Sequence, residues 1–251
     1  RSESVESSAT GEEDSYRELT FATSYSFGAW RLDAGAGLLD YTKLDDFSQR
    51  SLYLGGARGL RLGAWHLELG AHGTQLSFGG DVYERNVTAG LMASRVFDGG
   101  SRLRAQLRRA KVDGQGLFTG LTGDRTELGV YYDTTWRAWY LGAHTRGEIN
   151  DSEDSIFATR YVQIGAEARY SLTPLWALNL GAALRRTSRP TETDTLDGWD
   201  DDRLALQVGA TRALWKQAQL YMRYDVETND SPVPGFDYDR NRVAVSIEFW
   251  Y

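Results

Sequence analysis

Three histidines are the first residues in this chain whose side chains could carry out chemistry. His66 and His72 would point to the same side of an extended strand. Because they are six residues apart, about 20 Å at roughly 3.4 Å per residue, they cannot bind the same metal ion. His144 stands apart in sequence from any obvious serine or carboxylate partner. We therefore interpret all three as ordinary polar residues, and we predict no catalytic residue and no cofactor.

An acidic segment around Gly198 is the second candidate site. It contains Asp194, Asp197, Asp200, Asp201 and Asp202. Carboxylate oxygens of this kind can surround a divalent cation. The spacing does not match the EF-hand pattern, so we favour solvated surface charge over a metal site. The chain has no cysteine, which excludes disulfides and thiolate metal sites.

The elements that must position these residues are strands, because apolar and polar residues alternate along most of the chain. Short turns, near positions 28, 63, 99, 137, 173 and 214, alternate with longer polar loops. The repeat of about 36 to 41 residues fits two tilted membrane strands and one long loop. The strand at 51–62 is irregular, because Arg58 interrupts its apolar face. Gly55 and Gly56 predict a bulge that resets the register there.

Seven of the eight tryptophans mark one end of these strands. Six lie near short turns and one lies beside the last residue, Tyr251: Trp30, Trp65, Trp136, Trp139, Trp176, Trp215 and Trp250. An indole ring has an apolar body and one N–H that can stay hydrated, so rings at one level form the aromatic girdle of a membrane interface. A soluble β-sandwich or barrel, the alternative, gives no reason for tryptophan to mark every other turn.

Composition agrees with a membrane barrel. The mean hydropathy is −0.48, and no run approaches the roughly 20 apolar residues of a membrane helix. The net charge of −7 argues against a nucleic-acid partner. We predict an all-β fold, a transmembrane antiparallel up-and-down β-barrel of 12 to 14 strands over 16–251, with short periplasmic turns and long acidic extracellular loops. Residues 1–15 are predicted to be a polar tail.

The last strand carries a more specific signal. Val243, Val245, Ile247, Phe249 and Tyr251 share one face, and the alternation runs to an aromatic final residue. This ending resembles the terminal strand of Gram-negative outer-membrane β-barrels, where it is the assembly signal. The resemblance implies an integral outer-membrane protein, inserted by the barrel assembly machinery and in contact with lipid and lipopolysaccharide. The acidic segment could then bridge to lipopolysaccharide through Ca²⁺ or Mg²⁺.

In such a barrel the opposite face of each strand lines the lumen. The charged residues predicted there are Arg31, Asp33, Glu68, Arg102, Arg104, Arg108, Glu127, Asp133, Glu167, Arg169, Arg185, Arg223, Asp225, Arg242 and Glu248. Opposed rings of charge can sort solutes by sign. The same residues can instead form mutual salt bridges that fill and stiffen the interior. The sequence leaves both interpretations open.

The strand count raises a parity problem. The pattern gives thirteen strands, whereas bacterial single-chain barrels usually have an even number. An upstream strand, with or without a periplasmic domain, could be absent from this chain. Alternatively, one segment could lie in the lumen or rim, or a partner chain could supply a strand. We favour the upstream strand.

The segment NDSPVPGFDYDR at 229–240, followed by NRVAVSIEFWY, is similar to the last loop and strand of barrels that end larger export proteins. These include polysaccharide-secretion porins and surface lipoprotein assembly modifiers. The similarity transfers no site residue. We predict a channel, the pore module of an export or uptake system, that passes solute or polymer through a charged lumen. A surface receptor with a plugged lumen and a barrel enzyme are the alternatives, although no motif of the barrel enzymes is present.

Overall fold

The computed structural model describes residues 2–7, 13–42, 48–190, 198–233 and 236–249. Strands dominate the described residues, with two short 3-10 helices in the loops. Their bounds are β1 Ser2–Ser7, β2 Glu13–Phe27, β3 Trp30–Tyr41, β4 Gln49–Leu62, β5 Trp65–Phe78, β6 Asp81–Val96, β7 Arg102–Gly114, η2 Gly116–Leu121, β8 Gly123–Trp136, β9 Trp139–Ser152, η3 Ser155–Phe157, β10 Thr159–Ser171, β11 Trp176–Arg189, β12 Trp199–Trp215, β13 Ala218–Asp230 and β14 Tyr238–Phe249. No helix within these ranges is long and apolar enough to cross a membrane.

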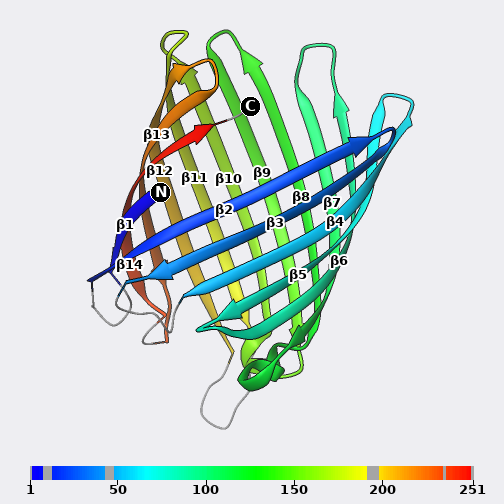
Figure 1. Cartoon of the computed structure of the whole chain (residues 1–251), viewed down its shortest axis with the longest axis vertical. Helices are drawn as coiled ribbons and strands as arrows, with labels where there is room; N and C mark the ends of the chain where they lie inside the picture. The colour runs from blue at the N-terminus through cyan, green and yellow to red at the C-terminus, as the bar shows by residue number, and fades with distance from the viewer. Residues whose placement is uncertain (1, 8–12, 43–47, 191–197, 234–235, 250–251) are drawn as a thin grey trace.

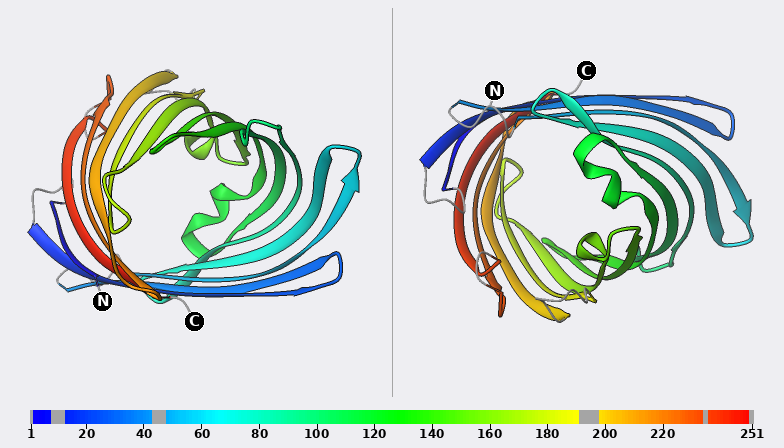
Figure 2. Two further views of the ribbon diagram at one scale, coloured as in Figure 1. Left: turned by 90° about the horizontal axis from the view of Figure 1, so that it is seen from above. Right: turned by 90° about the horizontal axis from the view of Figure 1, so that it is seen from below.

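The fourteen strands form one antiparallel sheet in which each strand pairs with the next along the chain. The sheet curls round until β1 lies beside β14, so that the strands enclose an interior (Figures 1 and 2). Among the described residues, no hydrogen-bonded ladder joins those two strands. The up-and-down barrel fold predicted from the alternation is therefore confirmed, with fourteen strands.

The outer face of the sheet is apolar. Leucine, isoleucine, valine and aromatic side chains on it are exposed, as at Leu54 (69% exposed) and Ile164 (63%). Fully buried apolar side chains within the described ranges are few and mostly small, such as Ala57, Ala110 and Val112. A soluble protein would bury its large apolar residues, so this distribution is that of a sheet solvated by lipid on the outside.

The prediction of a bulge in β4 is wrong. Residues 49–62 pair with β3 and β5 without a register shift, so Leu52, Leu54, Arg58 and Leu60 all share the outer face. Arg58 is tolerated there because its guanidinium stacks over the Trp30 ring, 5.4 Å from the centroid. Register shifts occur instead between Leu76 and Ser77 and between Ala213 and Trp215.

The N-terminal segment also departs from the prediction. Residues 1–15 were expected to be a tail outside the sheet, but Ser2–Ser7 is strand β1 and β2 begins at Glu13. β1 pairs along β2 from Ser2 opposite Glu18 to Ser7 opposite Glu13. The ladder uses backbone groups, so a strand can form here without the apolar alternation that identifies the other strands. The fourteenth strand thus lies within this chain, where we expected it upstream of Arg1.

Two long loops interlock at one end of the barrel. The β7–β8 loop contains η2 and the β9–β10 loop contains η3. Glu153 N donates to Thr122 O (2.7 Å), and Asp154 N donates to Gly120 O (3.1 Å). A Cβ at Gly120 would lie 2.8 Å from the Asp154 Cβ, so the close approach requires glycine. In end view η2 projects inside the ring of strands (Figure 2).

Candidate functional site

The interior of the barrel is the candidate functional site, because charged side chains gather there. Every charged residue predicted for the lumen occupies an inward position of its strand, opposite to the exposed apolar positions. The sequence analysis missed a second set of inward charges: Arg61, Glu84, Arg125, Arg146, Glu148, Arg189, Asp201, Arg203, Glu227 and Arg240. Most lie where strands run on past the apolar band toward the long loops.

Near the short turns, three inward arginines are held by carboxylates. Arg31 donates from Nε to Asp33 Oδ2 (2.9 Å) and from both Nη atoms to Glu68 (3.0 Å each). On β7, Arg102 Nε lies 3.1 Å from Asp133 Oδ1, and Arg104 Nη2 lies 3.8 Å from the same oxygen. These contacts join three arginines to three carboxylates at this end.

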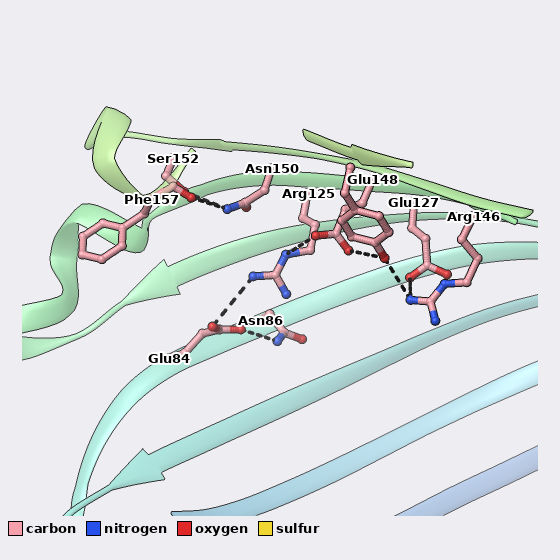
Figure 3. Close-up of polar contacts among 10 residues, drawn as sticks. Glu84, Asn86, Arg125, Glu127, Arg146, Glu148, Asn150, Ser152 and Phe157 are labelled. Atoms are coloured by element: carbon pink, nitrogen blue, oxygen red, sulfur yellow. Dashed lines mark hydrogen bonds and ion pairs between the residues drawn. The ribbon is translucent and has the colours of Figure 1, made fainter. Parts of the chain in front are cut away.

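Toward the long loops, a row of side chains of alternating charge, the charge ladder, crosses the inner faces of β6, β8, β9 and β10 (Figure 3). Arg125 lies 3.9 Å from both Glu84 and Glu148. Arg146 lies 3.9 Å from Glu127 and donates to the Tyr161 hydroxyl at 2.9 Å. The charge ladder binds four strands to one another through their inward side chains.

A second cluster at this end centres on Glu227. It accepts hydrogen bonds from the Tyr238 hydroxyl (2.6 Å), from Arg240 (3.4 Å) and from Arg203. Beyond it, Arg189 Nε lies 2.9 Å from Asp201 Oδ2, and the Trp199 indole donates to the other oxygen. Trp199 therefore lies on the inner wall, apart from the other described tryptophans.

Charge pairing on the inner wall is unequal. Strands β3 to β14 place fourteen arginines and eleven carboxylates inward, and the register of β1 and β2 puts Glu6, Asp14 and Glu18 at inward positions as well. Each of the eleven carboxylates has a donor or cation within reach, including Glu167 from Tyr140 and Glu248 from Tyr221. Arg61, Arg108, Arg169 and Arg185 have no carboxylate partner among the described residues. Among the inward side chains that the structure describes, four arginines therefore lack a carboxylate partner, whereas two carboxylates, Glu167 and Glu248, are held by neutral donors only.

A pocket of about 510 Å³ on the inner wall shows unequal pairing of its charged residues, although its formal charges balance. It is lined by Arg31, Asp33, Glu68, His72 and Arg108, among others. Arg31 is already shared between the two carboxylates. Arg108 is thus the cation in this pocket that remains available to a solute.

The histidines lie apart. His72 lines the pocket just described, and His66 contacts the backbone position of Gly59. His144 stacks on Tyr131, with ring centroids 5.9 Å apart, and its Nε2 lies 3.2 Å from Gln163 Nε2. No group of three or more metal-ligating side chains exists within the described ranges.

The acidic segment splits between the two faces. Asp200 and Asp202 share the outer face with Arg186, whereas Asp201 points inward. Arg186 donates to Asp200 Oδ2 at 2.5 Å, and this hydrogen bond lowers the pKa of the Asp200 carboxyl. Asp194 and Asp197 lie outside the described residues. The described aspartates therefore do not converge on one cation.

The predicted girdle lies at the short-turn ends of the strands. Trp30, Trp65, Trp136, Trp139 and Trp176 occupy outer positions there. The bulge after Ala213 places Trp215 opposite Ala218, on the same face as Leu220. Trp250 and Tyr251 lie outside the described residues.

In the terminal strand, Val243, Val245 and Ile247 are exposed on the outer face. The backbone of Phe249 pairs with Ala218. The ladder between β13 and β14 therefore runs to the last described residue of the strand.

No protein-family model and no curated protein sequence matches the chain. Solved structures do match. The anion-selective porin from Comamonas acidovorans superposes with a TM-score of 0.60 at 11% identity, covering 100% of this chain and 97% of that one. Pseudomonas aeruginosa OpdK, solved with vanillate, gives 0.58 at 14% identity over 98% and 72% of the two chains. Vibrio cholerae OmpT, an outer membrane protein, in a form lacking loop L8, gives 0.60 at 11% identity over 99% and 96%. The chain therefore has the fold of the bacterial outer-membrane porin barrels, in agreement with the integral outer-membrane location expected from its sequence.

Proposed function

We propose that this protein is an outer-membrane channel whose lumen favours small anionic solutes. The unequal pairing on the inner wall is the observation that supports this most directly. Fixed cations without partners raise the local concentration of anions and lower that of cations. Nine of the eleven carboxylates on the described wall of β3 to β14 already have an arginine beside them, so they attract a passing cation less strongly than free carboxylates would.

The similar structures agree with this proposal at the level of fold and described selectivity. The Comamonas protein is described as anion-selective, and OpdK was solved with vanillate. At 11% and 14% identity these likenesses carry no residue-level inference. The predicted role as the barrel module of an export or uptake system concerns the direction of transport and stays a prediction.

The test is single-channel conductance of the purified protein in a planar bilayer, with the reversal potential measured across a KCl gradient. We expect a steady open current and a reversal potential of the sign that shows chloride preference. A reversal potential that shows preference for potassium would contradict the proposal that the lumen favours anions. A folded but silent barrel would contradict the channel itself.

A surface receptor with an obstructed lumen is the second candidate, and the position of η2 inside the ring of strands favours it (Figure 2). Leu117 on η2 is 97% exposed, so the helix presents an apolar residue that packs on no wall. Deleting 116–121 distinguishes the two candidates. An obstructed barrel would gain conductance from the deletion by opening, whereas an open channel would conduct before and after it.

A further inference from the structure

We propose that three cross-strand tryptophan–arginine pairs on the outer face of the short-turn rim bind the phosphate of phospholipid headgroups. The pairs are Trp30 with Arg58, Trp65 with Arg95, and Trp176 with Arg212. In each pair the tryptophan is the first residue of its strand. The arginine lies directly opposite on the next strand, close to that strand's end. The same arrangement thus recurs on the β3–β4, β5–β6 and β11–β12 strand pairs.

The geometry of the pairs is also shared. The guanidinium carbon lies 5.4 Å from the Trp30 ring, 6.0 Å from the Trp65 ring and 5.2 Å from the Trp176 ring. The backbone repeats as well, because Gly59 N donates to Ala29 O and Ala213 N donates to Leu175 O, at equivalent places beside two of the pairs. The tryptophan–arginine arrangement therefore recurs at three positions, and at one of them the Arg95 guanidinium carbon also lies 5.0 Å from the Phe97 ring.

Each guanidinium carbon lies over a tryptophan ring. A cation–π contact uses the π face of the ring and the plane of the guanidinium, so the N–H groups around the edge can still donate. Those groups form the planar fork that matches a phosphate. Arg58, Arg95 and Arg212 have no carboxylate partner within the described residues. The Nε of Arg95 is buried, so at this pair only the terminal Nη atoms can reach a phosphate.

The charge of this rim fits an anionic ligand. Besides the three paired arginines, the described short turns carry Arg137, which stacks on Trp136 at 4.9 Å, and Lys216. Asp98 is the one carboxylate in those turns. The outer face at the opposite end is different, because Asp124 and Asp200 there balance Arg109 and Arg186. The short-turn rim is therefore a cationic belt on an acidic protein.

The location of the three pairs indicates that their anionic ligand is a lipid headgroup. The pairs face outward at the level of the tryptophan girdle, where indole rings lie among headgroups. Short turns face the periplasm in barrels of this kind, and the ligand there is a phospholipid phosphodiester. An interfacial arginine contributes about 1 kcal/mol toward an anionic surface, which corresponds to about a fivefold preference per site.

The experiment is native mass spectrometry of the folded protein in detergent with phosphatidylglycerol, with phosphatidylcholine and lipid A as separate additions. We expect the unmodified protein to retain phosphatidylglycerol most strongly. The variant Arg58→Gln/Arg95→Gln/Arg212→Gln should lose about fivefold in affinity per site. A matched control, Arg61→Gln/Arg108→Gln/Arg169→Gln, removes the same charge from the inner wall and should retain the lipid as before. The heat-modifiable mobility of the barrel in SDS gels shows that each variant is folded.

Equal retention by the two triple variants would overturn the proposal, because charge alone would then suffice. Preferential retention of lipid A at these three positions would overturn the assignment to phospholipid. If the first variant does not fold, Arg58→Lys/Arg95→Lys/Arg212→Lys keeps the charge and removes the planar fork. We expect it to bind phosphatidylglycerol more weakly than the unmodified protein, and unchanged binding would count against a fork-mediated contact.

Discussion

Replacing Arg108 by glutamine gives the sharpest test of the selectivity mechanism. In the pocket that it shares with Arg31, Asp33 and Glu68, two arginines face two carboxylates, and both carboxylates are already bound to Arg31. Arg108→Gln leaves that pocket with one net negative charge. The channel should therefore lose anion preference.

The magnitude follows from Coulomb's law for an ion passing the wall. At about 5 Å in water two unit charges interact by about 0.8 kcal/mol, and a Debye length of about 10 Å at 0.1 M salt reduces this to about 0.5 kcal/mol. That energy enriches an anion about 2.3-fold and depletes a cation about 2.3-fold. The ratio of anion to cation permeability should therefore fall about fivefold in 0.1 M KCl, and by less than about twofold in 1 M KCl, where the Debye length is about 3 Å.

The assay is the reversal potential across a threefold KCl gradient at both ionic strengths. Arg50→Gln is the matched control, because Arg50 lies on the outer face opposite Leu38 and its replacement makes the same charge change. An unchanged reversal potential for Arg108→Gln at low salt would refute the reasoning. A shift of the same size at both salt concentrations would also refute it, since screening must weaken a Coulombic effect.

Three further predictions concern stability and the loops. Glu227→Gln should destabilise the barrel by about 1 to 3 kcal/mol, because Arg203 and Arg240 lose a charged acceptor; unfolding in urea measures this, and the conservative Glu248→Gln is the comparison. Gly120→Val should separate the two interlocked loops, because a side chain there meets Asp154 and Phe157, and limited proteolysis should then cleave 115–122 faster than in the unmodified protein. The Arg186–Asp200 ion pair should persist at acidic pH, because the pKa of the Asp200 carboxyl is lowered in the folded state. The pair's contribution to the free energy of unfolding is fully present above the pKa of Asp200 in the unfolded chain and is lost as the pH falls through its folded pKa. A carboxyl titration of Asp200 by NMR with an unshifted midpoint would contradict that last expectation.

The alternation of residue types determined most of the fold in advance. With a period of two, a single correctly placed residue such as Leu178 fixes the direction of Asn179, Leu180 and the rest of its strand. Inward and outward faces were therefore predictable along the apolar band. The tryptophans also predicted where the membrane–water interface lies along the strands, because an indole ring with one hydrated N–H is enriched at that depth.

The pattern failed where lipid no longer constrains the outer face. Arg125, Glu148 and Glu227 lie on strands that continue past the apolar band, and there both faces are polar, so nothing in the sequence separates strand from loop. β1 was missed for the same reason. Arg58 was misinterpreted because a charged side chain on the outer face looks like a register error until its partner, Trp30, is known. The salt-bridge partners of Arg31 and Arg146 depend on how neighbouring strands are aligned. The alternation of residues within one strand does not determine that alignment.

The interlock of the β7–β8 and β9–β10 loops determines where this protein tolerates added sequence. Backbone hydrogen bonds from Glu153 and Asp154 to the neighbouring loop hold the two loops together, so a change in one loop affects the other. A tag or epitope inserted at 116–121 would therefore disturb residues 153–158 as well, although a whole hairpin separates them in the chain. The two-residue turn at Gly63 and Ala64 makes no backbone hydrogen bond to another loop within the described ranges, although the φ of +58° at Gly63 requires that the glycine itself be kept. Surface display on this scaffold would have to treat the interlocked loops as a single graft site and replace them together.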